Sequence, residues 1–286
     1  MEFTSESHEQ YREAYAMATR YQQKNQKQGL PVRPVALESL LNERMISCRI
    51  DLGVLEIPTS MIVGVAEETE GAGLYTKEFL PISKPNSDYA KAWCFIYAAC
   101  DGRTEIQDAI RCMEYLGKFY ICDGLKRVSV AKYLGHPVMR SQVIRIMPVK
   151  TDSREVELYY DFLLQYQLTQ MYQLQFTQRG YFEKLQKAMG KLPHGKWHDS
   201  ERSDFLSVWP TIENAFRESY ADNLPITPAD ALVVLLDKYP FVPIIRMDGW
   251  ILARLFQTVW KELFCLGDPC SATGSTNAVK AKRHTA

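Results

Sequence analysis

A short stretch of the chain, residues 118–127, joins the end of a predicted strand to the start of a predicted helix. It reads KFYICDGLKR, so Asp123 and Gly124 form the turn, and Lys126 and Arg127 fall in the first turn of the helix. The first amides of a helix have no acceptor within it, and the helix dipole favours anions at this end. Arginine can bond two phosphate oxygens at once, and lysine adds positive charge. The pattern therefore predicts a phosphate site at this turn, with the glycine allowing a close approach of the backbone.

The same residues also fit an interpretation without a ligand. In that case Asp123 caps the helix, and the side chains of Lys126 and Arg127 extend into water. Asp–Gly turns are common, so the spacing alone favours this solvated arrangement over a phosphate site. The spacing of these residues does not decide between a phosphate site and a solvated helix start.

Two further groups of residues could do chemistry. Glu105, at the start of a predicted strand, could face the same turn and act as a general base, although a surface carboxylate is the commoner case. His194 and His198 are four residues apart, which would suit a metal if they lay on a helix. Pro193 and Gly195 predict a loop there instead, so we expect no metal site. The sequence contains no Ser–His–Asp or Walker pattern.

Composition limits the classes of function. The 286 residues include 34 basic and 34 acidic side chains, a balance that gives no support to non-specific binding of nucleic acid. The seven cysteines form no CxxC pair, which predicts reduced and mostly buried thiols, and we expect Cys122 to be packed rather than nucleophilic. The polar N-terminus shows no signal-peptide pattern, and no apolar run approaches the about 20 residues of a membrane helix. We therefore expect a cytoplasmic protein.

The hydrophobic pattern changes from mixed to helical near the middle of the chain. Before this change it predicts helices at 5–28, 36–43, 88–101 and 125–134. It predicts a strand–turn–strand unit within 44–58. It also predicts a strand that begins at 105, a second strand that ends at Asp123, and a third at 138–147. After the change it predicts helices at 153–176, 181–189, 201–221, 227–238 and 247–265. A tail from 266 has lost its large apolar side chains and is expected to be disordered.

The run YICDGLKRVSVAKYLGHPVMRSQVI, residues 120–144, resembles the signature segment of the ParB/sulfiredoxin superfamily. In that family a strand leads into a glycine turn that ends in arginine, followed by a helix of the form RVxxAxxLG and another strand. The run LEIPTSMIVG, 55–64, is similar to the opening strand and turn of the same fold, and 105–110 lies where its central strand belongs. The resemblance covers roughly residues 50–147. The helical second half looks like the extension of a group of bacterial ParB-like proteins.

This resemblance implies a nucleotide site. The family turn holds the phosphates of CTP in partitioning proteins, of ATP in sulfiredoxin, and of a nucleotide in a free-serine kinase. By position Gly124 would be the close-approach glycine, Arg127 the phosphate arginine, and Asp123 the first residue of the turn. Lys126 stands where histidine or arginine is usual, and Leu125 replaces the reactive cysteine of sulfiredoxin, which excludes sulfinic-acid reductase activity. The implied ligand is CTP or ATP, with or without Mg²⁺, in a nucleotide-dependent switch, an NTPase or a phosphotransferase.

Two other functions remain as alternatives. A partitioning or transcription regulator would bind DNA through a helix–turn–helix after the strand at 138–147, but an acidic, Tyr/Leu/Gln-rich helix follows instead, so DNA is not the favoured partner. A degenerate scaffold would bind nothing at the turn. Oligomerisation through the helical half is open.

The overall expectation is an α+β chain. It has N-terminal helices at 1–43, a ParB/sulfiredoxin-like mixed-sheet domain at 44–150, an α-helical domain at 151–265 and a disordered tail at 266–286.

Overall fold

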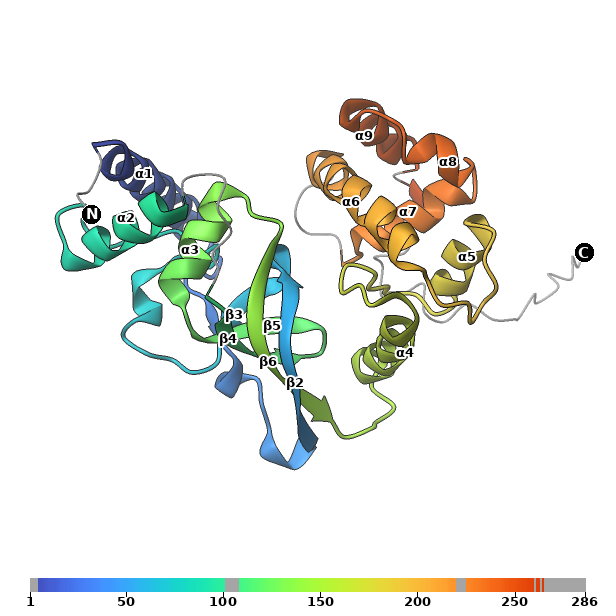
Figure 1. Ribbon diagram of the computed structural model, residues 1–286, viewed down its shortest axis with the longest axis horizontal. Coiled ribbons are helices and arrows are strands. Elements are labelled where there is room, and N and C mark those ends of the chain that lie inside the picture. Colours follow the sequence, from blue (N-terminus) through green and yellow to red (C-terminus); the bar gives the residue numbers. More distant parts are fainter. Residues whose placement is uncertain (1–4, 101–107, 220–224, 260, 263, 265–286) are drawn as a thin grey trace, which may run out of the picture. The chain divides into compact units, whose positions relative to one another are not determined.

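A computed structural model describes residues 5–100, 108–219, 225–259, 261–262 and 264. The chain divides into two compact units, the first ending at Tyr160 and the second beginning at Asp161 (Figure 1). This division falls within helix α4 (Arg154–Thr169), whereas the sequence placed it between residues 150 and 151. In the part of the chain that the structure describes, helices combine with a mixed sheet of six strands, which confirms the α+β class at this level. Among the described residues, no helix is both long and apolar enough to cross a membrane.

The first unit is built on the mixed sheet, whose strand order is β1-β3-β5-β4-β6-β2. The strands are β1 (Val35–Ala36), β2 (Ile46–Pro58), β3 (Ile62–Val65), β4 (Ile110–Tyr115), β5 (Lys118–Asp123) and β6 (Val138–Pro148). β3 and β5 are parallel neighbours, while β4 is antiparallel to β5. The C-terminal ends of β3 and β5 therefore meet the start of β4 at one edge of the sheet. This is the edge at which β5 turns into the next helix.

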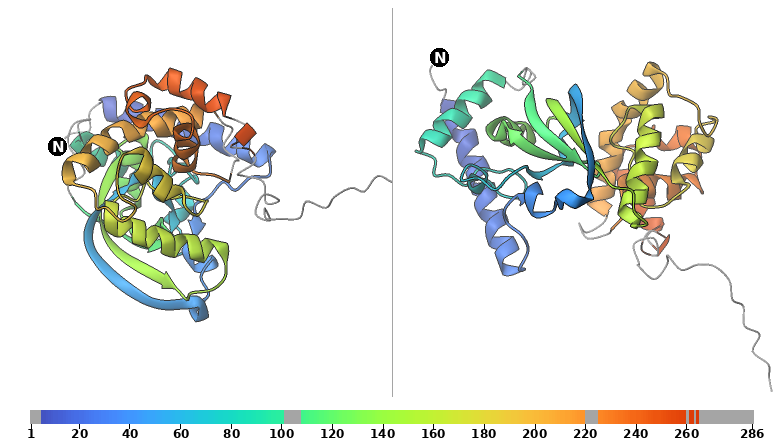
Figure 2. Two further views of the ribbon diagram at one scale, coloured as in Figure 1. Left: turned by 90° about the vertical axis from the view of Figure 1, so that its right-hand side faces the viewer. Right: turned by 90° about the horizontal axis from the view of Figure 1, so that it is seen from below.

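Three helices of the first unit pack together: α1 (Ser5–Lys27), α2 (Asp88–Cys100) and α3 (Leu125–Leu134). The ring of Tyr11 in α1 meets the ring of Trp93 in α2 edge to face, with the centroids 5.3 Å apart. The indole nitrogen of Trp93 donates to the hydroxyl of Ser129 in α3 at 3.0 Å. Figures 1 and 2 show α1 and α2 gathered on one side of the sheet. The N-terminal helix is thus part of the core of this unit.

The second unit is helical around its own apolar core. Its helices are the last part of α4, then α5 (Tyr181–Ala188), α6 (Asp199–Ser219), α7 (Pro228–Leu236), α8 (Phe241–Ile244) and α9 (Gly249–Thr258). At the start of α7, the Thr227 hydroxyl accepts from the amide of Asp230, and the Asp230 carboxylate accepts from the amide of Thr227. This reciprocal capping box fixes the first residue of α7.

Several predicted elements are confirmed. The helices expected at 5–28, 88–101 and 125–134 are α1, α2 and α3, each within about a residue of the predicted ends. The strand expected at 138–147 is β6. The strand expected from 105 corresponds to β4, which begins at Ile110; Asp108 and Ala109 are not part of it, and residues 101–107 are outside the described range. The predicted tail, 266–286, also lies outside it.

Three other predictions of secondary structure are wrong. The segment 36–43 contains short 3₁₀ turns rather than a helix. The segment 44–58 contains one strand, β2, which begins at Ile46, and not two strands. Its register shifts between Asp51 and Gly53, where Gly53 has a φ of +71°, so the expected turn is a bulge. The helix expected at 153–176 is α4, which ends at Thr169 because the backbone of Gln170 turns to a φ of +55°.

Candidate functional site

The corner between β5 and α3 is the place where the sequence predicted a phosphate site. β5 ends at Asp123, and α3 begins at Leu125. Gly124 is the N-cap and adopts the left-handed conformation, with φ +101° and ψ +22°. No side chain caps this end of the helix, so the proposed capping role of Asp123 is wrong. The first amides of α3 are therefore left for water or a ligand.

Packing within the protein accounts for the glycine at this corner. A Cβ atom built on Gly124 would lie 2.6 Å from Cγ2 of Ile110 and 3.0 Å from Nη2 of Arg127. Both the positive φ and this crowding exclude a larger residue. Gly124 is thus required by Ile110 and Arg127 on that side, and its presence does not by itself indicate a ligand.

Arg127 makes contacts inside the first unit. Its Nη1 donates to the carbonyl oxygens of Asp108, at 3.1 Å, and Ala109, at 3.2 Å. Its Nη2 donates to Oδ2 of Asp123 at 3.3 Å. The side chain of Asp123 is 56% exposed and that of Arg127 is 21% exposed, so solvent screens the ion pair. Arg127 therefore ties α3 to the segment before β4, and only its contact with Asp123 is weakly held.

The side chain of Lys126 lies over the ring of Tyr89 and does not extend freely into water. Its Nζ is 5.4 Å from the ring centroid of Tyr89 in α2, within the range of a cation–π contact. The next residue toward the turn, Leu125, lines a pocket. Glu105, the predicted general base, is outside the described residues.

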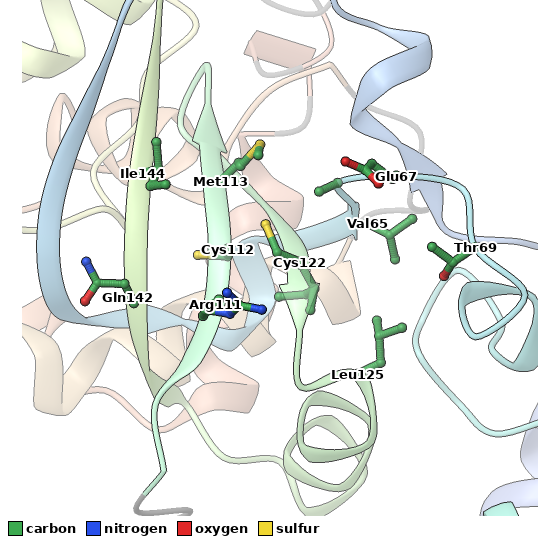
Figure 3. A pocket seen from close by; sticks show the side chains of 12 residues that line it. Val65, Glu67, Thr69, Arg111, Cys112, Met113, Cys122, Leu125, Gln142 and Ile144 are labelled. Atoms are coloured by element: carbon green, nitrogen blue, oxygen red, sulfur yellow. The ribbon is translucent and has the colours of Figure 1, made fainter.

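The pocket beside the corner has a volume of about 330 Å³ (Figure 3). It is lined by residues of four neighbouring strands in the order β3, β5, β4 and β6, and by the loop after β3. Met113 and Ile144 contribute apolar surface, and Arg111 contributes positive charge. Arg111 is the cross-strand neighbour of Asp123, so the pocket adjoins the corner directly. Its volume lies at the lower end of the range for small-molecule sites.

The polar side chains of the pocket differ in whether they have a partner within the protein. Nε2 of Gln142, on β6, donates to Oδ1 of Asp51 on β2 at 2.6 Å, which fixes the amide. Arg111 has no ion-pair or hydrogen-bond partner for its side chain among the described residues. Glu67, in the loop after β3, likewise forms no ion pair within the described part of the chain.

Cys122 is exposed in this pocket, so the expectation that it is packed is wrong. Partial burial raises the pKa of its thiol, the positive charge of Arg111 acts against that rise, and the charges of Glu67 and Asp123 add to it. A register shift between Arg111 and Cys112 leaves Cys122 without a cross-strand partner on β4.

Sequence reasoning found the corner but missed the pocket residues Arg111, Glu67 and Gln142. A signal for Arg111 was present, because the strand 110–115 alternates, and Ile110 is buried while Arg111 is exposed. No comparable signal existed for Glu67, which lies in a loop without a motif.

Metal ligands do not cluster in the described part of the chain. It contains no group of three or more His, Cys, Asp and Glu side chains that could hold a metal ion. His194 and His198 lie in the predicted loop, between α5 and α6. Mg²⁺ in nucleotide sites often binds one or two carboxylates together with the phosphates. At the corner, Asp123 is a carboxylate that could contact such an ion.

Two comparisons with known proteins were negative. No family model matches the sequence, and no curated protein matches it. The likeness to the ParB/sulfiredoxin superfamily thus rests on the motifs within residues 50–147.

Proposed function

We propose that the β5–α3 corner binds the phosphates of a nucleotide, CTP or ATP, in a ParB-like protein that acts as a nucleotide-dependent switch or a phosphotransferase. The observation that supports this most directly is the uncapped start of α3, which has Lys126 and Arg127 in its first turn. Unpaired amides and two cations at a helix N-terminus form a standard setting for phosphate groups. The resemblance of residues 120–144 to the family signature points to the same turn.

The contacts of Arg127 decide how such binding would proceed. Two of its hydrogen bonds go to backbone carbonyls and hold the guanidinium beside the corner. The third goes to the exposed carboxylate of Asp123, and a pair of this kind contributes at most about 1 kcal/mol. A phosphate oxygen can replace that carboxylate at small cost, while the other two bonds keep Arg127 in position.

The test is a titration of the full chain with CTP, ATP, GTP and UTP, with and without Mg²⁺, followed by calorimetry and thermal denaturation. We expect one nucleotide to raise the melting temperature, and Lys126→Glu to weaken its binding by about tenfold or more, because one charge-assisted contact is worth about 1.5–3 kcal/mol. Lys126→Glu is preferred to Arg127→Ala, because Arg127 also supports the fold. Lys84→Glu, at an exposed position on the loop before α2, is the matched control and should bind like the unaltered protein.

Silence of all four nucleotides at millimolar concentration would overturn this proposal. Gly124 and Arg127 would then have a structural role only, through their contacts within the first unit, and the corner would bind no ligand. Equal weakening by Lys126→Glu and Lys84→Glu would also count against it, because general electrostatics and not the helix start would then attract the nucleotide.

A further inference from the structure

The pocket beside the corner holds two opposite charges that do not pair with each other. Arg111 comes from β4, and Glu67 comes from the loop after β3 (Figure 3). Neither side chain forms an ion pair with any residue in the described part of the chain. In Figure 3 the sulfur of Cys122 lies between them, and the charges of both act on its thiol. The pocket therefore offers a positive and a negative group to one small molecule.

We propose that this pocket binds a small zwitterion, an α-amino acid with an apolar side chain, whose carboxylate pairs with Arg111 and whose ammonium group pairs with Glu67. Arg111 and Glu67 are both exposed to solvent, and a ligand with a single charge would pair with only one of them, whereas a zwitterion pairs with both. A nucleotide brings negative charge only, and Glu67 disfavours it in this pocket. The inference goes beyond the proposed nucleotide site and does not depend on it.

Size and surface restrict the ligand further. The volume of about 330 Å³ suits a compact metabolite better than a nucleoside triphosphate. Val65, Met113 and Ile144 give the pocket apolar surface next to its charged groups, which suits a leucine-, methionine- or phenylalanine-like side chain. Gln142 is already fixed by its bond to Asp51, so one polar contact is preorganised.

The experiment compares three matched ligands by calorimetry on the full chain: L-leucine, N-acetyl-L-leucine, which lacks the ammonium group, and L-leucinamide, which lacks the carboxylate. L-methionine, L-phenylalanine and L-serine complete the panel. We expect L-leucine to bind, each analogue to bind about tenfold more weakly, and L-serine to bind less well than the apolar amino acids.

Two variants assign the charges. Glu67→Gln should remove the difference between L-leucine and its N-acetyl form, and Arg111→Gln should remove the difference between L-leucine and L-leucinamide. Glu56→Gln on β2 and Arg12→Gln on α1 are exposed controls outside the pocket and should leave all differences unchanged. The proposal is overturned if no amino acid binds at 10 mM to the folded protein, or if the three leucine derivatives bind equally.

Thiol labelling gives a second measurement on the same pocket. Bound L-leucine should slow alkylation of Cys122 several-fold, while Cys48, an exposed thiol on β2 outside the pocket, serves as the internal control. Equal protection of both thiols, or of neither, contradicts binding at this place. Nucleotide titrations are independent of this result, so failure here and failure of the nucleotide proposal are distinguishable.

Discussion

Two arginine–carboxylate pairs in the first unit have the same chemistry and opposite surroundings. Arg145 on β6 pairs with Glu114 on β4, where the side chains are 10% and 0% exposed. Glu114 also accepts from the amide of Gly117 at 2.7 Å and from the hydroxyl of Tyr159 at 3.0 Å. Arg127 pairs with Asp123 at the corner, where the carboxylate is 56% exposed and has no second partner among the described residues.

The difference shows which pair belongs to the fold and which can serve a ligand. Removing one member of a buried pair leaves an uncompensated charge, so the pair of Glu114 and Arg145 cannot exchange partners during function. Water already screens the pair of Asp123 and Arg127, so its exchange for another anion costs little. The pair at the corner is therefore the one that an incoming anion could open, and the buried pair holds together the sheet beside it.

The largest effect should come from breaking the buried pair. Glu114→Ala leaves Arg145 without its counter-ion and removes the acceptor for Gly117 and Tyr159. We expect the free energy of unfolding to fall by about 3–5 kcal/mol, measured by urea denaturation. Glu56→Ala on the exposed part of β2 is the control, with an expected change within about 0.5 kcal/mol. A loss below 1 kcal/mol for Glu114→Ala would mean that solvent reaches the pair and that the contrast with the corner does not exist.

A smaller effect should separate crowding from backbone strain at the corner. Gly124 and Gly135 flank the same helix, α3, and both have a positive φ, +101° and +70°. A Cβ on Gly124 would meet Ile110, whereas a Cβ on Gly135 would meet nothing within 4 Å. We expect Gly135→Ala to cost about 1 kcal/mol, from backbone strain alone, and Gly124→Ala to cost about 2–4 kcal/mol. Equal losses in urea denaturation would show that Ile110 moves aside easily and that the corner has room for a ligand on that side.

The sequence predicted the elements of the corner well because their signals are local. The apolar run ending at Asp123, the Gly124 turn and the periodic helix closed by Gly135 all depend on neighbours in the chain. The same kind of local pattern misled at 44–58, where Gly53 suggested a turn between two strands but marks a bulge inside β2.

The pocket could not be predicted in the same way because it depends on strand register. Its groups come from β3, β5, β4, β6 and a loop, and the order of these strands does not follow their order in the chain. Cys122 lies at a one-residue register shift opposite Arg111, which no property of the sequence near Cys122 indicates. Likewise, the carbonyls of Asp108 and Ala109 that hold Arg127 lie 19 and 18 residues away along the chain.

The smallest effect on stability, and the most informative one about function, should come from the exposed pair. Asp123→Asn removes a screened ion pair, so the free energy of unfolding should change by less than about 1 kcal/mol in urea denaturation. The same change frees the Nη2 group of Arg127 and removes a negative charge from the corner, so the affinity for the nucleotide should rise about threefold or more.

A matched control separates these two causes of tighter binding. Asp108→Asn, at an exposed position whose backbone carbonyl contacts Arg127, removes one negative charge near the corner without removing the ion pair, and a purely electrostatic effect would raise the affinity in both variants. If only Asp123→Asn binds the nucleotide more tightly, Arg127 has exchanged a carboxylate for a phosphate. Asp123→Asn could instead weaken nucleotide binding in the presence of Mg²⁺ and leave it unchanged in its absence. In that case the carboxylate of Asp123 binds the metal ion, and Asp123 rather than Arg127 is the member of the pair that contributes to binding.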